Sequence, residues 1–197
     1  MKHFGDERSG DWQARALPLL TWIEQGGMLE ANIEASAFAC EMPRLYQVSA
    51  HPPRQALSWR ASGLTETRSD QNPHDMRERR HWLRLEANAQ LILTCQRCMH
   101  PLTVDLHIKR RFLVAIDEAS ADRLEDAAQD DYDVIAHEQR FDLLALTEDE
   151  LLLALPIVPK HRECDPPGLL PSEESASFDR PRPFAVLAQL KRDKLRD

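Results

Sequence analysis

The chain is poor in glycine, has few cysteines and lacks a long apolar run, and each shortage excludes a class of protein. With only 6 glycines and 29% charged residues beside 42% apolar residues, it can form a core and is not wholly disordered. Its 4 cysteines are too few for a disulfide framework in 197 residues. The longest apolar run, Leu151–Val158, is interrupted by Pro156 and is far too short to span a membrane.

Common catalytic and targeting patterns are also missing. The chain has no phosphate loop and no GxGxxG pattern, and its 8 histidines are scattered without a Ser-His-Asp arrangement. The N-terminal stretch MKHFGDERSG is polar and has no apolar signal core. We therefore expect a cytoplasmic protein that is not an enzyme, has no small-molecule substrate and does not act at a membrane.

What the chain does contain is a pair of cysteines between two alternating segments. From Leu83 to Cys95 the apolar residues occupy odd positions, and from Leu102 to Ile116 they occupy even positions. A period of two predicts two antiparallel strands joined at the CxxC motif. Two cysteines at a hairpin tip can aim both sulfurs at one point, which is half of a tetrahedral zinc site. A redox pair or two buried thiols would have the same spacing.

Two later residues can complete a metal site. Cys95 and Cys98, together with His161 and Cys164, form a Cys3His set, which is common in closed structural zinc sites. A closed site leaves no coordination position for substrate, so zinc here would be structural. The gap between the two halves is long, and spacing alone equally allows His161 and Cys164 to be unrelated surface residues.

Positive charge is in deficit, because the net charge is −8. A protein whose whole surface binds nucleic acid is usually basic, so any RNA contact must be local or made through a protein partner. Local candidates are Arg97 at the hairpin tip and the run Lys109, Arg110 and Arg111. The alternative is that these side chains are a solvated face that balances the acidic segment 119–138.

A Leu-rich helix is predicted after Asp142, which can cap it, and it carries Glu148, Asp149 and Glu150. Consecutive acids point to different faces of a helix, so they do not converge on a catalytic or metal site. We interpret these three acids as a solvated face or as a surface that contacts a protein partner.

The remaining patterns predict an α+β protein: an antiparallel sheet with a CxxC hairpin, a Leu-rich helix, helices near both termini and long polar loops. We expect a flexible N-terminus over 1–10, one α+β domain over 11–160, and an extended tail over 161–197 with a short C-terminal helix. The expected helices are 14–24, 143–155 and one beginning near Pro183. The expected strands outside the hairpin are 28–39, 45–50 and 55–61, and the expected polar loops are 62–80 and 119–138.

Three consecutive segments of the chain resemble motifs of the YceD family, the large ribosomal RNA subunit accumulation proteins. They read LTCQRCMHPL, FDLLALTEDELLLALPIVPKH and PRPFAVLAQLKR and cover most of Leu91–Arg192. The resemblance implies a bacterial ribosome biogenesis factor that supports synthesis, processing or stability of large-subunit (23S) ribosomal RNA, with no established catalytic residues. Its implied partner is ribosomal RNA or a pre-ribosomal particle, contacted directly or through a protein.

The resemblance also implies a cysteine-rich segment after the helix, where this chain has only His161 and Cys164. An alternative function is that of an adaptor, which would recruit a nuclease or assembly factor through the acidic segment and the Leu-rich helix. A thioredoxin-like role would place the CxxC at the start of a helix in a βαβ unit, whereas this one lies between antiparallel strands.

Overall fold

The computed structural model describes residues 12–53, 55–68, 78–125 and 132–166. The chain divides into two units, Met1–Cys164 and Asp165–Asp197, and the architecture below is that of the first. The predicted flexible N-terminus and C-terminal helix lie outside the described residues.

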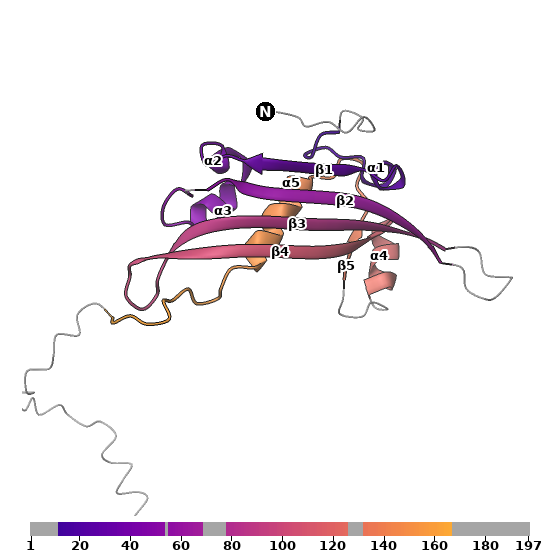
Figure 1. Cartoon of the computed structure of the whole chain (residues 1–197). Coiled ribbons are helices and arrows are strands. Elements are labelled where there is room, and N and C mark those ends of the chain that lie inside the picture. The colour runs from indigo at the N-terminus through magenta and orange to yellow at the C-terminus, as the bar shows by residue number, and fades with distance from the viewer. Residues whose placement is uncertain (1–11, 54, 69–77, 126–131, 167–197) are drawn as a thin grey trace, which may run out of the picture. The chain divides into compact units, whose positions relative to one another are not determined.

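A mixed sheet with the strand order β1-β2-β3-β4-β5 forms the body of the first unit (Figure 1). Neighbours from β1 to β4 are antiparallel, and β5 joins β4 in parallel. The predicted α+β class is confirmed, with this one parallel pairing as the departure from an antiparallel sheet. The strands are β1 (Met28–Ile33), β2 (Leu57–Arg68), β3 (Glu78–Thr94), β4 (Pro101–Ala115) and β5 (Asp133–Ala136).

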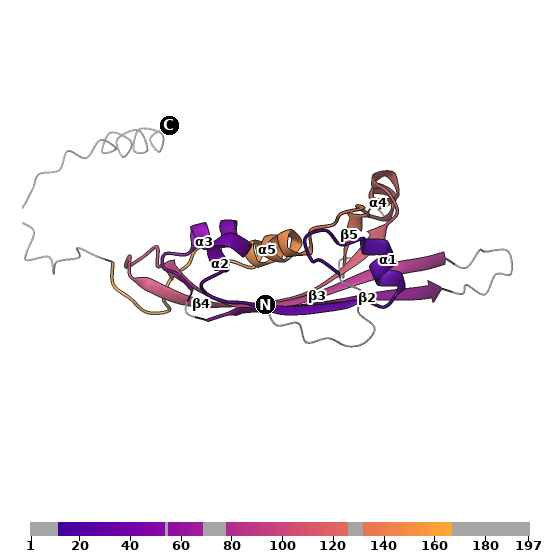
Figure 2. The ribbon, with the colours of Figure 1, turned by 90° about the horizontal axis from the view of Figure 1, so that it is seen from above.

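Helices α2, α3 and α5 lie on one face of the sheet (Figure 2). Alternation along β3 creates this face, since Leu83, Leu85 and Leu91 are fully buried while Arg84 and Glu86, between them, are exposed. Burying each leucine contributes roughly 1.5–3 kcal/mol to folding. The helices are α1 (Leu19–Glu24), α2 (Phe38–Glu41), α3 (Pro43–Val48), α4 (Glu118–Glu125) and α5 (Leu143–Leu153).

The two best-supported predicted elements are present. The CxxC hairpin is β3 and β4, and the Leu-rich helix is α5, whose N-cap Asp142 accepts a hydrogen bond from the Ala145 amide at 2.9 Å. Helix α1 begins after Pro18 and ends before Gly26, whose φ of 64° is the left-handed conformation that ends many helices. Among the described residues, no helix combines the length and apolar character that crossing a bilayer requires.

Before the hairpin, one predicted strand is wrong and another is too long. The segment 45–50 is mostly helix α3, because Pro43 occupies the first helical turn, where its fixed φ favours a helix start. The strand expected over 28–39 ends at Ile33. A turn follows, closed by a hydrogen bond from the Ala37 amide to the Glu34 carbonyl, and leads into α2.

Both predicted polar loops contain regular structure. Strands β2 and β3 extend into this range over 62–68 and 78–80, where oppositely charged residues such as Glu66 and Arg80 lie opposite each other in place of apolar periodicity. The segment 119–138 contains most of α4 and all of β5. Asp117 caps α4 by accepting a hydrogen bond from the Ser120 amide at 2.7 Å, and Val134 and Ile135 pair with β4.

Candidate metal centre and charged surfaces

The tip of the β3–β4 hairpin is a tight, hydrogen-bonded turn. The Cys95 amide donates to the His100 carbonyl and the Met99 amide donates to the Cys95 carbonyl, both at 2.9 Å. Met99 adopts a left-handed conformation with a φ of 62°. This geometry places Cys95 and Cys98 at the tip, as the alternating strands predicted, and both side chains are buried.

The chain after α5 returns to this tip (Figure 1). The Gln96 amide donates to the Pro159 carbonyl at 2.8 Å, which ties the returning segment to the turn by backbone alone. Two residues later the His161 amide lies 3.4 Å from the Cys95 Sγ. This return path closes the long sequence gap that made the metal site uncertain from spacing.

Four potential ligands therefore meet at one place. The Cys95 and Cys164 Sγ atoms are 3.8 Å apart, the Cys98 Sγ lies 3.2 Å from the His161 Nδ1, and all four donor atoms lie within 4.8 Å of one another. Donors at the corners of a zinc tetrahedron are separated by roughly 3.5–4 Å. The four residues fit a metal ion of this kind and could hold one.

The imidazole ring of His161 is also oriented by a contact on the nitrogen that does not face the sulfurs. Its Nε2 lies 3.2 Å from the Pro101 carbonyl oxygen, at the first residue of β4. With the proton on Nε2, that nitrogen donates to the carbonyl and Nδ1 keeps its lone pair for a metal. A hydrogen bond of this kind commonly fixes the tautomer of a metal-binding histidine.

The sulfurs differ in acidity. Burial raises the pKa of Cys95, but N–H donors of Cys98, His161 and Arg97 outweigh it and lower that pKa to about 5. Burial raises the pKa of Cys164, and hydrogen bonds and repulsion from the other two sulfurs bring it to about 11. Repulsion disfavours more than one thiolate among three sulfurs this close, and a bound divalent cation would offset that repulsion.

The helix acids are only partly solvated. Glu148 is 4% exposed and accepts hydrogen bonds from the amides of Arg44 and Leu45 at 2.7 and 2.9 Å, and its carboxylate also binds the Arg44 Nε. The solvated-face interpretation is therefore wrong for Glu148 and for Glu150, which is 7% exposed. Asp149 has an exposed side chain and binds the outer nitrogen of Arg44. A role for these acids in partner binding stays a prediction.

Glu150 pairs with one of the predicted RNA-binding residues. The Arg110 Nε lies 2.8 Å from Glu150, and its guanidinium also binds Asp133 at 2.5 Å. Burial raises the pKa of the Glu150 carboxyl, and the positive charge of Arg110 opposes this rise. Arg110 thus connects α5, β4 and β5 within the protein.

The other basic candidates divide between two places. Arg97 lies at the hairpin tip beside the four potential metal ligands. Lys109 and Arg111 lie far along β4, on the sheet face opposite the helices, and bind Glu86 and Glu66 at 3.2 and 3.1 Å. One residue that sequence reasoning missed, Arg84, lies directly opposite Arg111 on β3. Whether any of them binds RNA stays a prediction.

Comparison with known proteins gives one consistent result. A family model described as large ribosomal RNA subunit accumulation protein YceD matches residues 83–191, which hold most of β3, all of β4 and α5, and all four potential ligands. A curated protein of that name from Haemophilus influenzae is 36% identical over 109 residues, covering 50% of this chain. The match spans 59% of that relative's length. No solved structure matches the chain.

Proposed function

Because the chain belongs to the YceD family of large ribosomal RNA subunit accumulation proteins, we propose that it supports synthesis, processing or stability of large-subunit (23S) ribosomal RNA. The observation that carries this proposal is the family match over 83–191, together with the relative of the same name. The chain acts in the cytoplasm as a ribosome biogenesis factor and not as an enzyme. Its partner is ribosomal RNA or a pre-ribosomal particle.

The proposed function includes a structural zinc ion. The ion is held by Cys95, Cys98, His161 and Cys164, whose donor atoms lie within 4.8 Å of one another. Zinc supplies a link between two parts of the chain and no reactive group, because four protein ligands complete its usual shell. The protein's own residues prepare the site: the turn buries two sulfurs, and the Pro101 carbonyl orients the imidazole.

The experiment that tests the function is deletion of the gene in its native host. We expect the ratio of large-subunit to small-subunit ribosomal RNA to fall and the amount of free large subunits to change in sucrose gradients. The wild-type gene on a plasmid restores both. Unchanged RNA ratios and ribosome profiles in the deletion strain would contradict the proposal.

A second candidate function is that of an adaptor for a nuclease or assembly factor. One observation favours it: three apolar side chains at and just after the end of α5 are exposed, Leu153 by 76%, Ile157 by 97% and Val158 by 51%. Exposed apolar side chains that cluster often mark protein-binding surfaces. Pull-down of ribosomal RNA at two salt concentrations separates the two functions, because direct RNA contact weakens steeply with salt.

A further inference from the structure

On the sheet face opposite the helices, one row of side chains across neighbouring strands alternates between negative and positive charge. The row crosses four strands, with Glu30 beside Arg60, Arg60 beside Glu86, and Glu86 beside Lys109. Arg60 binds Glu30 at 2.7 Å and Lys109 binds Glu86 at 3.2 Å. Alternation of sign across a sheet is the arrangement that stabilises an exposed face.

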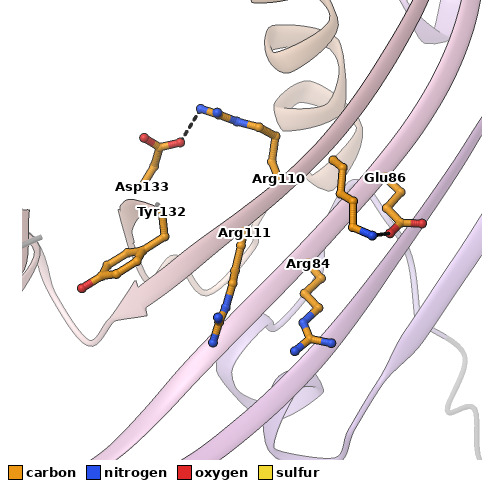
Figure 3. Close-up of a pocket in the computed structure, with 7 residues that line it drawn as sticks. Arg84, Glu86, Arg110, Arg111, Tyr132 and Asp133 are labelled. Carbon is orange, nitrogen blue, oxygen red and sulfur yellow. Dashed lines mark hydrogen bonds and ion pairs between the residues drawn. The ribbon is translucent and has the colours of Figure 1, made fainter. Parts of the chain in front are cut away.

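The adjacent row breaks this rule. Here Ser62 lies beside Arg84, and Arg84 lies directly opposite Arg111. Figure 3 shows the side chains of Arg84 and Arg111 extending to the same side of neighbouring strands, whereas Arg110 turns away toward Asp133. Like charges directly opposite each other destabilise a sheet. Among the described residues, none forms a hydrogen bond or ion pair with the exposed side chain of Arg84.

Arg111 is held in position by its surroundings. Its guanidinium carbon lies 3.8 Å from the centre of the Trp82 ring, and one nitrogen binds Glu66 at 3.1 Å. Trp82 is 4% exposed, and Tyr132 packs against it edge to face with ring centres 5.0 Å apart. A cation stacked on a buried aromatic ring keeps its charge in a fixed place, so little ordering is needed when an anion arrives.

The two arginines border an open hollow of about 460 Å³. Its two acids are both engaged, Glu86 by Lys109 and Asp133 by Arg110. Arg110 and Arg111 also bind Glu150 and Glu66. Among the described residues, Arg84 is therefore the lining cation whose charge no acid balances, in a chain whose net charge is −8. The lining residues of the hollow are Arg84, Glu86, Lys109, Arg110, Arg111, Tyr132 and Asp133.

We propose that this hollow binds a backbone phosphate of RNA, with Arg84 and Arg111 as the contacting residues and Lys109 beside them. Guanidinium groups match phosphate oxygens in charge and in hydrogen-bond geometry. A phosphate between the two arginines replaces their repulsion with two attractive contacts. The choice of RNA as the source of the phosphate rests on the proposed function, which it deepens by assigning the chain a direct RNA contact.

Fluorescence anisotropy of a fluorescein-labelled, single-stranded 30-nucleotide RNA from 23S ribosomal RNA, titrated with the full chain at several salt concentrations, tests the proposal. Arg84→Gln should weaken binding about tenfold at low salt and reduce the slope of log affinity against log salt by about 0.7. The matched control is Arg60→Gln, which removes the same charge from the same face at a paired position. Arg60→Gln should change the affinity for RNA less than about threefold, since Arg60 is not one of the proposed phosphate-contacting residues.

Several outcomes would overturn the proposal. The first is no RNA binding by the wild-type chain at low salt. The second is an equal loss for Arg84→Gln and Arg60→Gln, which would show a diffuse charge effect. The third is competition by poly-glutamate as effective as that by unlabelled RNA, which would indicate an acidic protein as the partner. Inorganic phosphate should displace the RNA only at far higher concentration, whereas displacement at equal concentration would indicate a site for free phosphate.

Stability measurements separate binding from folding. Arg84→Gln should melt at the wild-type temperature or above it, because it relieves repulsion, and melting several degrees lower would show that Arg84 is structural. In cells, a deletion that lowers large-subunit RNA, combined with full rescue by Arg84→Gln, would overturn the phosphate site and leave the proposed function intact. A deletion without effect would contradict the function alone, while the anisotropy result would still decide the site.

Discussion

At the tip of the β3–β4 hairpin, four donor side chains from two distant segments face one another, whereas further along the same strands Arg84 and Arg111 face each other with no acid between them. The two cysteines of the turn are buried, and the turn is tied to the segment after α5 by hydrogen bonds. The arginine pair lies on an open face. The four side chains at the tip could hold a metal ion without any other molecule. The arginine pair, in contrast, lacks an acid to balance it, and we propose that a phosphate from a partner does so.

The largest expected effect comes from replacing one of the four potential metal ligands at the hairpin tip. Cys98→Ser should abolish zinc binding and lower the melting temperature by ten degrees or more, because metal binding to a structural site contributes directly to folding free energy. Adding Cys164→Ser should lower it little further, since both changes act through one ion. Differential scanning calorimetry with and without chelator measures this.

The matched control for the tip is Cys40→Ser, because Cys40 is a free, exposed cysteine outside the site. It should leave zinc content and melting temperature unchanged. Equal destabilisation by Cys40→Ser and Cys98→Ser would contradict a special role for the tip.

A second prediction concerns the buried acid that connects α5 to α3. Glu148→Ala should cost about 2–4 kcal/mol of unfolding free energy, because it leaves two amides and Arg44 without their acceptor. The neighbouring Asp149→Ala should cost less than about 1 kcal/mol, since its ion pair is exposed. Urea unfolding measures both, and equal costs would show that burial of Glu148 does not matter.

Replacing Glu150 should change the unfolding free energy less than replacing Glu148, and its effect should depend on pH. Its folded-state pKa is raised above the ordinary value of 4.5, chiefly by burial. The folded state therefore binds the proton more tightly than the unfolded state, so this group's contribution to stability falls as pH rises from 4.5 through the folded pKa. Glu150→Gln should remove that part of the decline in urea titrations between pH 4 and 7. A decline of unchanged size would contradict burial as the dominant cause.

The smallest expected change in unfolding free energy is at the pair of arginines, Arg84 and Arg111. Arg84→Gln should stabilise the fold by about 0.2–1 kcal/mol, because it removes a like-charge pair. Arg111→Gln relieves the same repulsion but loses the contact with Trp82 and the ion pair with Glu66, so it should destabilise the fold by up to about 1 kcal/mol. Urea unfolding of the two variants side by side tests the opposite signs, and a shared sign would contradict the account of this pair.

The elements that the sequence predicted are those whose stability is encoded locally. The alternation from Leu83 to Cys95 reports half-burial directly, and Asp142 marks the start of α5 by its own capping bond. Helix α3 was missed because a six-residue apolar pattern fits a strand as well as a helix. Strand β5 was missed because acidic neighbours obscure its short apolar pair, Val134 and Ile135.

The candidate sites could be predicted only in part, for a similar reason. Donor chemistry selected the four potential ligands, but their convergence depends on the path after α5, which no local pattern encodes. Glu148 was misinterpreted because its partner Arg44 lies 104 positions away. The Arg84–Arg111 pair was within reach, since a hairpin turn between Thr94 and Pro101 sets the register that pairs these two arginines.

The most direct test of the account is the metal content of the protein purified without a histidine tag, measured by native mass spectrometry. The account predicts one zinc ion per chain, retained through gel filtration and lost in Cys98→Ser while Cys40→Ser keeps it. Zinc well below one equivalent in the wild-type chain, with a melting temperature that a chelator does not change, would contradict a metal centre at the hairpin tip.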